Sequence, residues 1–349
     1  MNWSARHLLD VENMSVQELE WLFGVAAEFR AELDRGTDAG PVAAAEATAA
    51  GARLGDQHVA LLFAEPSTRT RLSFEIAARR LGAHTYLLDP PSSSMVKGET
   101  LTDTVRNLDA IGFTTLVVRH HRAGAPWVAA RYFSGHVVNA GDGWHAHPTQ
   151  ALLDLFTLRR AWGGGVDAVR GRKIAIVGDI LHSRVARSNI WSLTQAGADV
   201  WLCGPRAWIR GFDQMAQGLP ADRSLSVTDS LESALAGADA VMGLRVQKER
   251  IKGGVSVAEY LERYQINAAS FARAKPGALY LHPGPINEGV EVTRDVCLGP
   301  RSLVMEQARN GVPIRMAVLT LVSGVGRGAA APSPDQVSAL TRDLSSAIR

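Results

Sequence analysis

The chain has 349 residues, 46% of them hydrophobic, and its formal net charge at pH 7 is only +2. That length corresponds to about two domains, and the hydrophobic share is enough to fill a core in each. A charge so close to neutral argues against non-specific binding to nucleic acid or to a membrane surface. We therefore expect neither a nucleic-acid partner nor a membrane partner.

Cysteine usage and the N-terminus indicate the compartment. Cys203 and Cys297 match no metal-ligand spacing and form no disulfide framework, which favours a reducing cytoplasm. The first residues, MNWSARHLLDVENM, contain no apolar core of the signal-peptide kind. No run approaches the roughly eighteen apolar residues of a membrane span, so none is expected.

The first part of the chain is predicted to alternate strands with helices. Ser15 and Glu18 have the spacing of a capping box and open a helix within residues 1–35. Apolar runs predict strands at 59–63, 85–88, 115–118 and 137–139, and helical spacing predicts helices at 72–81, 101–111 and 151–161. Polar motifs stand where these strands end, as in an open α/β sheet that binds ligands at its carboxyl edge.

A run of glycines at 163–165 marks a break, after which a second α/β series follows. Strands are predicted at 173–177, 199–202, 225–227, 240–244 and 278–281, and helices at 188–196, 231–236 and 305–322. The predicted fold class is α/β, with two doubly wound domains of parallel sheets linked by two long helices. The first domain covers 1–150 and is completed by a C-terminal helix at about 305–325, the second covers 151–304, and 326–349 form a peripheral tail.

The stretch Ser67-Thr68-Arg69-Thr70 lies between a buried strand and a helix. A helix start carries unpartnered N–H groups and the positive end of the helix dipole, which together bind anions. Hydroxyls and a guanidinium crowded there predict a phosphate site. An ordinary Ser/Thr helix cap beside surface arginines is the alternative.

Three motifs in the second half follow predicted strands. V-G-D-I-L-H-S-R at 177–184 lacks the G-x-G-x-x-G pattern of dinucleotide binding but supplies Arg184. Arg184, with Arg245 and Gln247 of R-V-Q-K-E-R at 245–250, suits a small dicarboxylate, although solvated charge is the alternative. H-P-G-P at 282–285 is either a plain tight turn or a stiff loop whose carbonyls accept from a ligand amine.

Taken in series, these motifs resemble the aspartate/ornithine carbamoyltransferases, and within them the catalytic chains of the aspartate type. The resemblance covers about residues 4–325 and is carried by F-x-E-x-S-T-R-T-R-x-S-F-E at 63–75, S-x-x-x-K-G-E-T-L-x-D-T at 93–104, R-H at 119–120, G-D-G-x-x-x-H-P-T-Q at 141–150, and the three motifs above. It implies transfer of the carbamoyl group of carbamoyl phosphate to L-aspartate, in pyrimidine synthesis, with no cofactor and no metal.

The resemblance also implies roles for residues. The residues implied to bind carbamoyl phosphate are Ser67, Thr68, Arg69, Thr70, Ser93, Arg119, His147 and Gln150. Among these, Arg119 would reach both the phosphate and the carbonyl oxygen. His147 would polarise the carbonyl, and Gln150 would hold the carbamoyl nitrogen. The aspartate set is Lys97, Arg184, Arg245, Gln247 and the carbonyls of Pro283 and Gly284. Ser93 and Lys97 come from a neighbouring subunit in this family, which implies a homotrimer with shared active sites.

The reaction explains these residue types. Negative charge builds on the carbamoyl oxygen, and Thr70, Arg119 and His147 form a donor set for it; the loss of one such donor costs roughly 10²–10³ in rate. The leaving phosphate is hypothesised to take the amine proton itself. His145 and His147 are two residues apart and could be taken for metal ligands, but no third ligand is apparent in the sequence.

Alternatives remain at this stage. Ornithine carbamoyltransferases typically carry H-C-L-P at 282–285 and lack R-V-Q-x-E-R, and an inactive paralogue usually loses the basic groups that this chain keeps. His121 and Glu288 depart from the family, which commonly has Pro and a basic residue there. A separate regulatory or dihydroorotase partner chain would leave no trace in this sequence.

Overall fold

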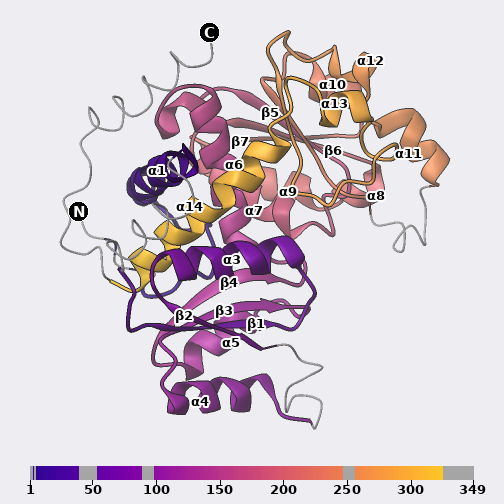
Figure 1. Cartoon of the computed structure of the whole chain (residues 1–349). Coiled ribbons are helices and arrows are strands. Elements are labelled where there is room, and N and C mark those ends of the chain that lie inside the picture. The colour runs from indigo at the N-terminus through magenta and orange to yellow at the C-terminus, as the bar shows by residue number, and fades with distance from the viewer. Residues whose placement is uncertain (1–2, 4, 39–52, 89–97, 247–255, 325–349) are drawn as a thin grey trace. The chain divides into compact units, whose positions relative to one another are not determined.

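The computed structural model describes residues 3, 5–38, 53–88, 98–246 and 256–324 (Figure 1). Contacts divide the chain into two compact units, Met1–Leu153 with Arg309–Arg349, and Asp154–Ala308. The chain enters the second unit within helix α6 (Pro148–Ala161) and returns to the first within helix α14 (Val304–Val322). Each unit is built around one parallel sheet.

The sheet of the first unit has a switch point at its centre. Its strands are β1 (His58–Phe63), β2 (His84–Leu88), β3 (Thr115–His120) and β4 (His136–Asp142), all parallel, in the order β2-β1-β3-β4. The chain runs outward from β1 to β2 and then crosses back to β3, so the direction of strand order reverses between β1 and β3. Ligands of open α/β sheets bind beyond the carboxyl ends of the strands at such a point.

Helices cover both faces of this sheet. In Figure 1, α3 (Thr68–Arg80) lies on one face, and α4 (Leu101–Ile111) and α5 (Ala125–Tyr132) lie on the other. The core between the sheet and α4 and α5 contains Ala60, Leu62, Val105, Leu108, Leu116, Val118, Ala129, Phe133 and Val137. Because both faces are covered, β1 reads as an unbroken apolar run rather than as an alternating strand.

Both ends of the described chain contribute to the first unit. Helix α1 (Val16–Asp38) begins with the predicted capping box: the Ser15 N–H donates to Glu18 Oε2 at 2.8 Å, and the Glu18 N–H donates to Ser15 Oγ at 3.2 Å. Further along α1, Arg30 Nη1 donates to Oδ1 of Asn310 in α14 at 2.6 Å, in a buried bond. Helix α14 is therefore tied to the N-terminal helix.

The second unit repeats the design with a larger sheet. Its strands are β5 (Lys173–Val177), β6 (Asp199–Cys203), β7 (Ser224–Thr228), β8 (Ala240–Gly243) and β9 (Leu279–Leu281), all parallel, in the order β7-β6-β5-β8-β9. Its switch point lies between β5 and β8. The predicted fold class, two doubly wound α/β domains with parallel sheets, is confirmed.

Helices and an aromatic cluster pack the second sheet. Helix α7 (Arg184–Gln195) follows β5 and has twelve residues. One core cluster of this unit contains the aromatic residues Trp208, Tyr260, Tyr264, Phe271 and Tyr280. A buried aromatic ring removes far more surface from water than an aliphatic side chain does.

The structure differs from the sequence prediction mainly in short elements. Strand β3 continues to His120 and β4 to Asp142, so both run past their predicted ends, and α7 begins at Arg184 rather than at Ser188. The sequence did not predict the short helices α5, η3 (Val166–Val169), α8 (Arg206–Ile209), α9 (Phe212–Gln217), α11 (Val257–Tyr264), α12 (Ala268–Phe271) and α13 (Arg294–Cys297). The helix predicted at 231–236 is α10 (Leu231–Leu235). One or two turns of helix contain too few residues to show a periodic pattern. Within the described ranges, no helix has the length and apolarity of a membrane span.

Candidate active site

The predicted phosphate-binding stretch lies at the switch point of the first sheet. Ser67 is the N-cap of α3, with extended backbone angles, and its side chain makes no capping hydrogen bond to the helix. Thr68 and Arg69 are exposed, whereas Thr70 is buried in the first turn. Ser67 thus caps α3 by position but without the side-chain hydrogen bond of an ordinary cap. The amino end of a helix of this length is suited to bind an anion.

Arg119 reaches the same edge from β3. Its residue exposure is 8%, Nη2 donates to Glu65 Oε1 at 2.7 Å, and Nη1 donates to the Ala140 carbonyl at 3.2 Å. Glu65 lies just after β1, and Ala140 lies near the carboxyl end of β4; both strands pair with β3. The guanidinium is thus held across the switch point, with its charge partly met by Glu65.

His147 is presented by a loop that Asp142 organises. Asp142 is fully buried at the end of β4, where Oδ1 accepts from Asn139 Nδ2 at 2.9 Å and from the Ala146 N–H at 3.0 Å, and Oδ2 accepts from the Gly124 N–H at 2.6 Å. His147 follows, 4% exposed, directly before α6, and Gln150 lies in the first turn of that helix.

A glycine is required beside Asp142. Gly143 has φ of +48°, and a Cβ there would lie 2.7 Å from the Ala123 backbone nitrogen. The G-D-G segment therefore packs directly against the loop that follows β3. This packing connects the end of β3, which carries Arg119, to the loop that leads to His147.

The other histidines of this region have different surroundings. His145 lies 3.1 Å from Asp142 Oδ2 and 3.4 Å from Asp10 Oδ2. In the described part of the chain, no three His, Cys, Asp or Glu side chains gather in the manner of a metal site. His121 stacks on His120 with ring centroids 4.3 Å apart, and burial, followed by the charges of His121 and Arg122, lowers the pKa of His120.

In the second unit, Arg184 and Arg245 lie at the switch point between β5 and β8. Gly178 ends the β5 run with φ of +134°, and a Cβ there would lie 3.0 Å from the Leu244 carbonyl oxygen, so only glycine allows this approach. Ser183 caps α7 by accepting from the Ala186 N–H at 3.1 Å, which makes Arg184 its first residue. Arg245 lies two residues after the end of β8, and its buried Nε has no hydrogen-bond partner among the described residues.

The H-P-G-P loop follows β9 on the same edge. The Gly284 N–H donates to His282 Nδ1 at 2.8 Å, and the His282 N–H donates to Gln307 Oε1 at 2.9 Å. Pro283 and Gly284 are half-buried. Glu288, the departure from the family, is exposed and lies 3.4 Å from Arg294 of α13, so its charge already has a partner.

Three predicted site residues, Ser93, Lys97 and Gln247, lie outside the described residues. Sequence reasoning missed the supporting carboxylates Glu65, Asp142 and Glu291. Glu65 and Asp142 lie inside the motifs at 63–75 and 141–150, and this position was the only sign in the sequence that they support the site. Their partners are distant in sequence, so no spacing rule reveals the contacts.

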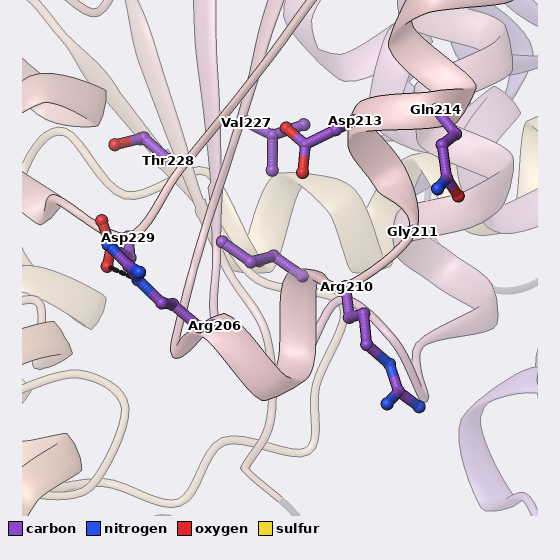
Figure 2. Close-up of a pocket in the computed structure, with 9 residues that line it drawn as sticks. Arg206, Arg210, Gly211, Asp213, Gln214, Val227, Thr228 and Asp229 are labelled. Atoms are coloured by element: carbon purple, nitrogen blue, oxygen red, sulfur yellow. Dashed lines mark hydrogen bonds and ion pairs between the residues drawn. The ribbon is translucent and has the colours of Figure 1, made fainter.

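A surface pocket of about 520 Å³ lies elsewhere in the second unit, beyond the carboxyl ends of β6 and β7 (Figure 2). Arg206 and Asp229 form a 2.6 Å ion pair at its wall. The Arg206 side chain is 87% exposed, and none of the predicted site residues lines the pocket. We therefore do not assign the reaction to it.

Fold and site together define a class: a two-unit α/β protein with basic side chains at the switch point of each parallel sheet. Residues 6–160 match the carbamoyl-phosphate-binding domain of the aspartate/ornithine carbamoyltransferases, and residues 170–322 match their Asp/Orn-binding domain. The chain belongs to the aspartate/ornithine carbamoyltransferase family.

Relatives of the aspartate type resemble the chain over nearly its whole length. The aspartate carbamoyltransferase catalytic subunit of Roseiflexus sp. (strain RS-1) is 45% identical over 321 residues, covering 91% of this chain and 95% of that protein. The catalytic subunit of Synechococcus sp. (strain RCC307) is 46% identical over 342 residues, covering 92% and 94%.

Solved structures of both substrate types share the fold. Ornithine carbamoyltransferase from Pyrococcus furiosus has a TM-score of 0.79 at 26% identity, covering 95% of this chain and 100% of that chain. Aspartate transcarbamoylase from Trypanosoma cruzi, in complex with carbamoyl aspartate and phosphate, has a TM-score of 0.75 at 30% identity, covering 90% and 94%. Backbone similarity thus does not separate aspartate from ornithine as substrate.

Proposed function

We propose that the protein is an aspartate carbamoyltransferase, which converts carbamoyl phosphate and L-aspartate to N-carbamoyl-L-aspartate and phosphate in de novo pyrimidine biosynthesis. The observation that carries the choice of aspartate is the 45% identity, over 91% of the chain, to a catalytic subunit of that name. Arg184 and Arg245 at the second switch point agree with it, because guanidinium groups pair with carboxylates and repel an ornithine ammonium.

Carbamoyl phosphate is assigned to the domain of residues 1–150, completed by the helix at about 305–325. The amino end of α3 and the side chains of Ser67, Thr68, Arg69 and Thr70 bind the phosphate, with Ser93 from a neighbouring subunit. Support comes from the position of these described residues at the switch point and from the free capping position of Ser67. Arg119 contacts both the phosphate and the carbonyl oxygen, His147 contacts that oxygen, and Gln150 holds the carbamoyl nitrogen.

Aspartate is assigned to the domain of residues 151–304. Arg184, Arg245 and Gln247, with Lys97 of a neighbouring subunit, bind its carboxylates. The carbonyls of Pro283 and Gly284 accept hydrogen bonds from its amino group. The buried Arg245 Nε supports this assignment, because a buried guanidinium nitrogen without a described partner is costly unless a ligand meets it.

The reaction proceeds by attack of the aspartate amine on the carbamoyl carbon. A C–N bond forms, negative charge builds on the carbamoyl oxygen, and the C–O bond to phosphate then breaks. Thr70, Arg119 and His147 donate to the developing oxyanion, and their fixed positions avoid reorganisation at the moment of reaction. The departing phosphate takes the amine proton, so no side chain needs to act as base.

The active unit is proposed to be a cytoplasmic homotrimer with shared sites. Support comes from large apolar side chains that stand exposed on α3 and on the edge strand β2, namely Leu72, Ile76, Tyr86 and Leu87. An exposed apolar edge of this kind normally has a protein partner. A separate regulatory or dihydroorotase chain is a further candidate partner. Residues 326–349, predicted as a peripheral tail, lie outside the described residues.

A colorimetric assay for ureido products tests the proposal. The purified protein with carbamoyl phosphate should form product with L-aspartate and at least about 100-fold less with L-ornithine, since a site built for two carboxylates leaves its arginines unpaired with ornithine. Product from ornithine alone would support the ornithine alternative. Product from neither would indicate an inactive paralogue.

A further inference from the structure

Glu291 is a fully buried carboxylate next to the candidate aspartate site. Its residue exposure is 0%, and it follows the H-P-G-P loop by a few residues. A carboxylate removed from water is costly unless hydrogen bonds meet both its oxygens. The contacts of Glu291 show where those bonds come from.

The two carboxylate oxygens of Glu291 bond two different loops. Oε1 accepts from the Asn287 N–H at 2.5 Å, in the segment that follows H-P-G-P. Oε2 accepts from the Val246 N–H at 3.4 Å, in the segment after β8. Val246 directly follows Arg245, so one side chain contacts both segments assigned to aspartate.

A third bond closes this arrangement into a ring. Asn287 Nδ2 donates to the Val246 carbonyl at 2.8 Å. The N–H of Val246 is thus bonded to Glu291, and its carbonyl to Asn287, whose own N–H returns to Glu291. The peptide group on either side of Val246 is fixed relative to the H-P-G-P segment.

The same carboxylate is connected to the base of the H-P-G-P loop. Glu291 Oε1 lies 3.4 Å from Nε2 of His282, and both side chains are fully buried. His282 also accepts from the Gly284 N–H through Nδ1, at 2.8 Å. The backbone of the loop is therefore constrained from inside by the pair of Glu291 and His282.

We propose that Glu291 is a positioning residue for aspartate, which sets the separation between the Arg245 guanidinium and the Pro283 and Gly284 carbonyls. This separation corresponds to that between a carboxylate and the amino group of the ligand. The inference rests on the proposed function and deepens it, because it assigns the selection of an amino diacid to a residue that touches no substrate.

The chemistry requires a carboxylate at this position. Glutamine has one acceptor oxygen and presents an N–H₂ group in place of the other. In Glu291→Gln one of the two backbone donors, at Val246 or Asn287, would face a second donor and lose its partner. The two loops would then no longer share one acceptor group.

The test compares Glu291→Gln with the matched control Asp239→Asn. Asp239 is a buried carboxylate of the same unit that accepts from the Lys173 N–H at 3.0 Å, but it lies at the amino edge of the sheet, just before β8. Both variants are expected to lower the melting temperature. Only Glu291→Gln should raise the KM for aspartate, by at least tenfold, while the Kd for inorganic phosphate stays within twofold of wild type.

Asn287→Ala is the second variant, and it decides the matter if Glu291→Gln does not fold. It leaves the buried carboxylate intact and removes the bond to the Val246 carbonyl, so the KM for aspartate should again rise with phosphate binding unchanged. An unchanged KM in the folded variants would overturn the inference. Wild-type protein that forms no carbamoyl aspartate would instead refute the proposed function, so the two failures are distinct.

Discussion

Glu65 Oε1 and Arg119 Nη2 lie 2.7 Å apart at the switch point of the first sheet. Glu65 follows β1, and Arg119 is near the end of β3, so the pair joins the two strands between which the strand order reverses. The pairing fixes the planar guanidinium while its other edge, through Nη1, bonds the Ala140 carbonyl. Under the proposed function, a ligand phosphate would meet an arginine that is already oriented.

Arg119→Lys is therefore expected to be severe despite the conserved charge. A lysine ammonium lacks the planar fork needed to keep both protein contacts and still donate to a carbonyl oxygen. We expect kcat to fall by about 10²–10³, measured with the ureido assay. Arg106→Lys, at an exposed arginine of α4, is the matched control and should stay within twofold of wild type. A kcat for Arg119→Lys close to that of the control would contradict the role given to Arg119.

Asp142→Asn tests the loop that presents His147. The buried carboxylate accepts from Gly124, Ala146 and Asn139, and an amide opposes one of these donors with its own N–H₂ group. Leaving a buried donor unmet costs about 1–3 kcal/mol, so the free energy of unfolding should fall by that amount. Urea unfolding measures it.

Activity of the same variant, at temperatures where it remains folded, separates stability from site geometry. We expect kcat to fall at least tenfold, because His147 follows the loop that Asp142 holds. Asp109→Asn, whose carboxylate accepts from the exposed Ser134, is the control and should change both quantities little. Full activity of folded Asp142→Asn would show that the loop does not depend on this carboxylate.

The stability of the first unit is expected to depend on pH through His7. Its pKa is lowered to about 4, first by burial and then by the positive charges of Arg6 and His136. Its Nδ1 accepts from the Val137 N–H at 3.1 Å, which a protonated nitrogen cannot do. The unfolded chain, with a histidine pKa of about 6.5, binds the proton more readily than the folded chain.

His7 therefore stabilises the folded chain more at higher pH. The contribution of His7 is complete above pH of about 6.5 and is lost as the pH falls towards 4, since protons then favour the unfolded chain. His7→Asn, which keeps an acceptor but cannot titrate, should flatten the fall in unfolding free energy over this window. Urea unfolding at several pH values measures it; identical slopes for both proteins would exclude His7 as the cause.

The sequence predicted best the strands and helices whose patterns depend only on residues adjacent in the chain. The β1 run HVALLF is a local pattern, and the strand is found where it lies. The helix after it is found too, but α3 begins at Thr68, about one turn before the predicted start at Leu72. Parallel pairing then brings the motifs at the ends of β1 and β3 to one edge of the sheet. The fold class and the positions of Arg119, Arg184 and Arg245 at the switch points follow from this.

The supporting contacts could not be predicted, because they join residues far apart in the chain. Asn287 and Val246 are bonded through a carboxylate whose burial no local pattern indicates. A charged residue such as Glu291 reads as surface in a sequence, since carboxylates are rarely fully buried. Short helices such as α8 and α12 are likewise fixed by packing rather than by periodicity.

The bond between Arg30 and Asn310 has a consequence for synthesis of the protein. Helix α14 leaves the ribosome last among the described helices, yet it supplies a buried partner to the first one. The N-terminal half cannot finish folding as it emerges and must wait until the whole second unit has been translated. For the same reason, the first unit, unlike Asp154–Ala308, cannot be exchanged between proteins as one uninterrupted gene segment.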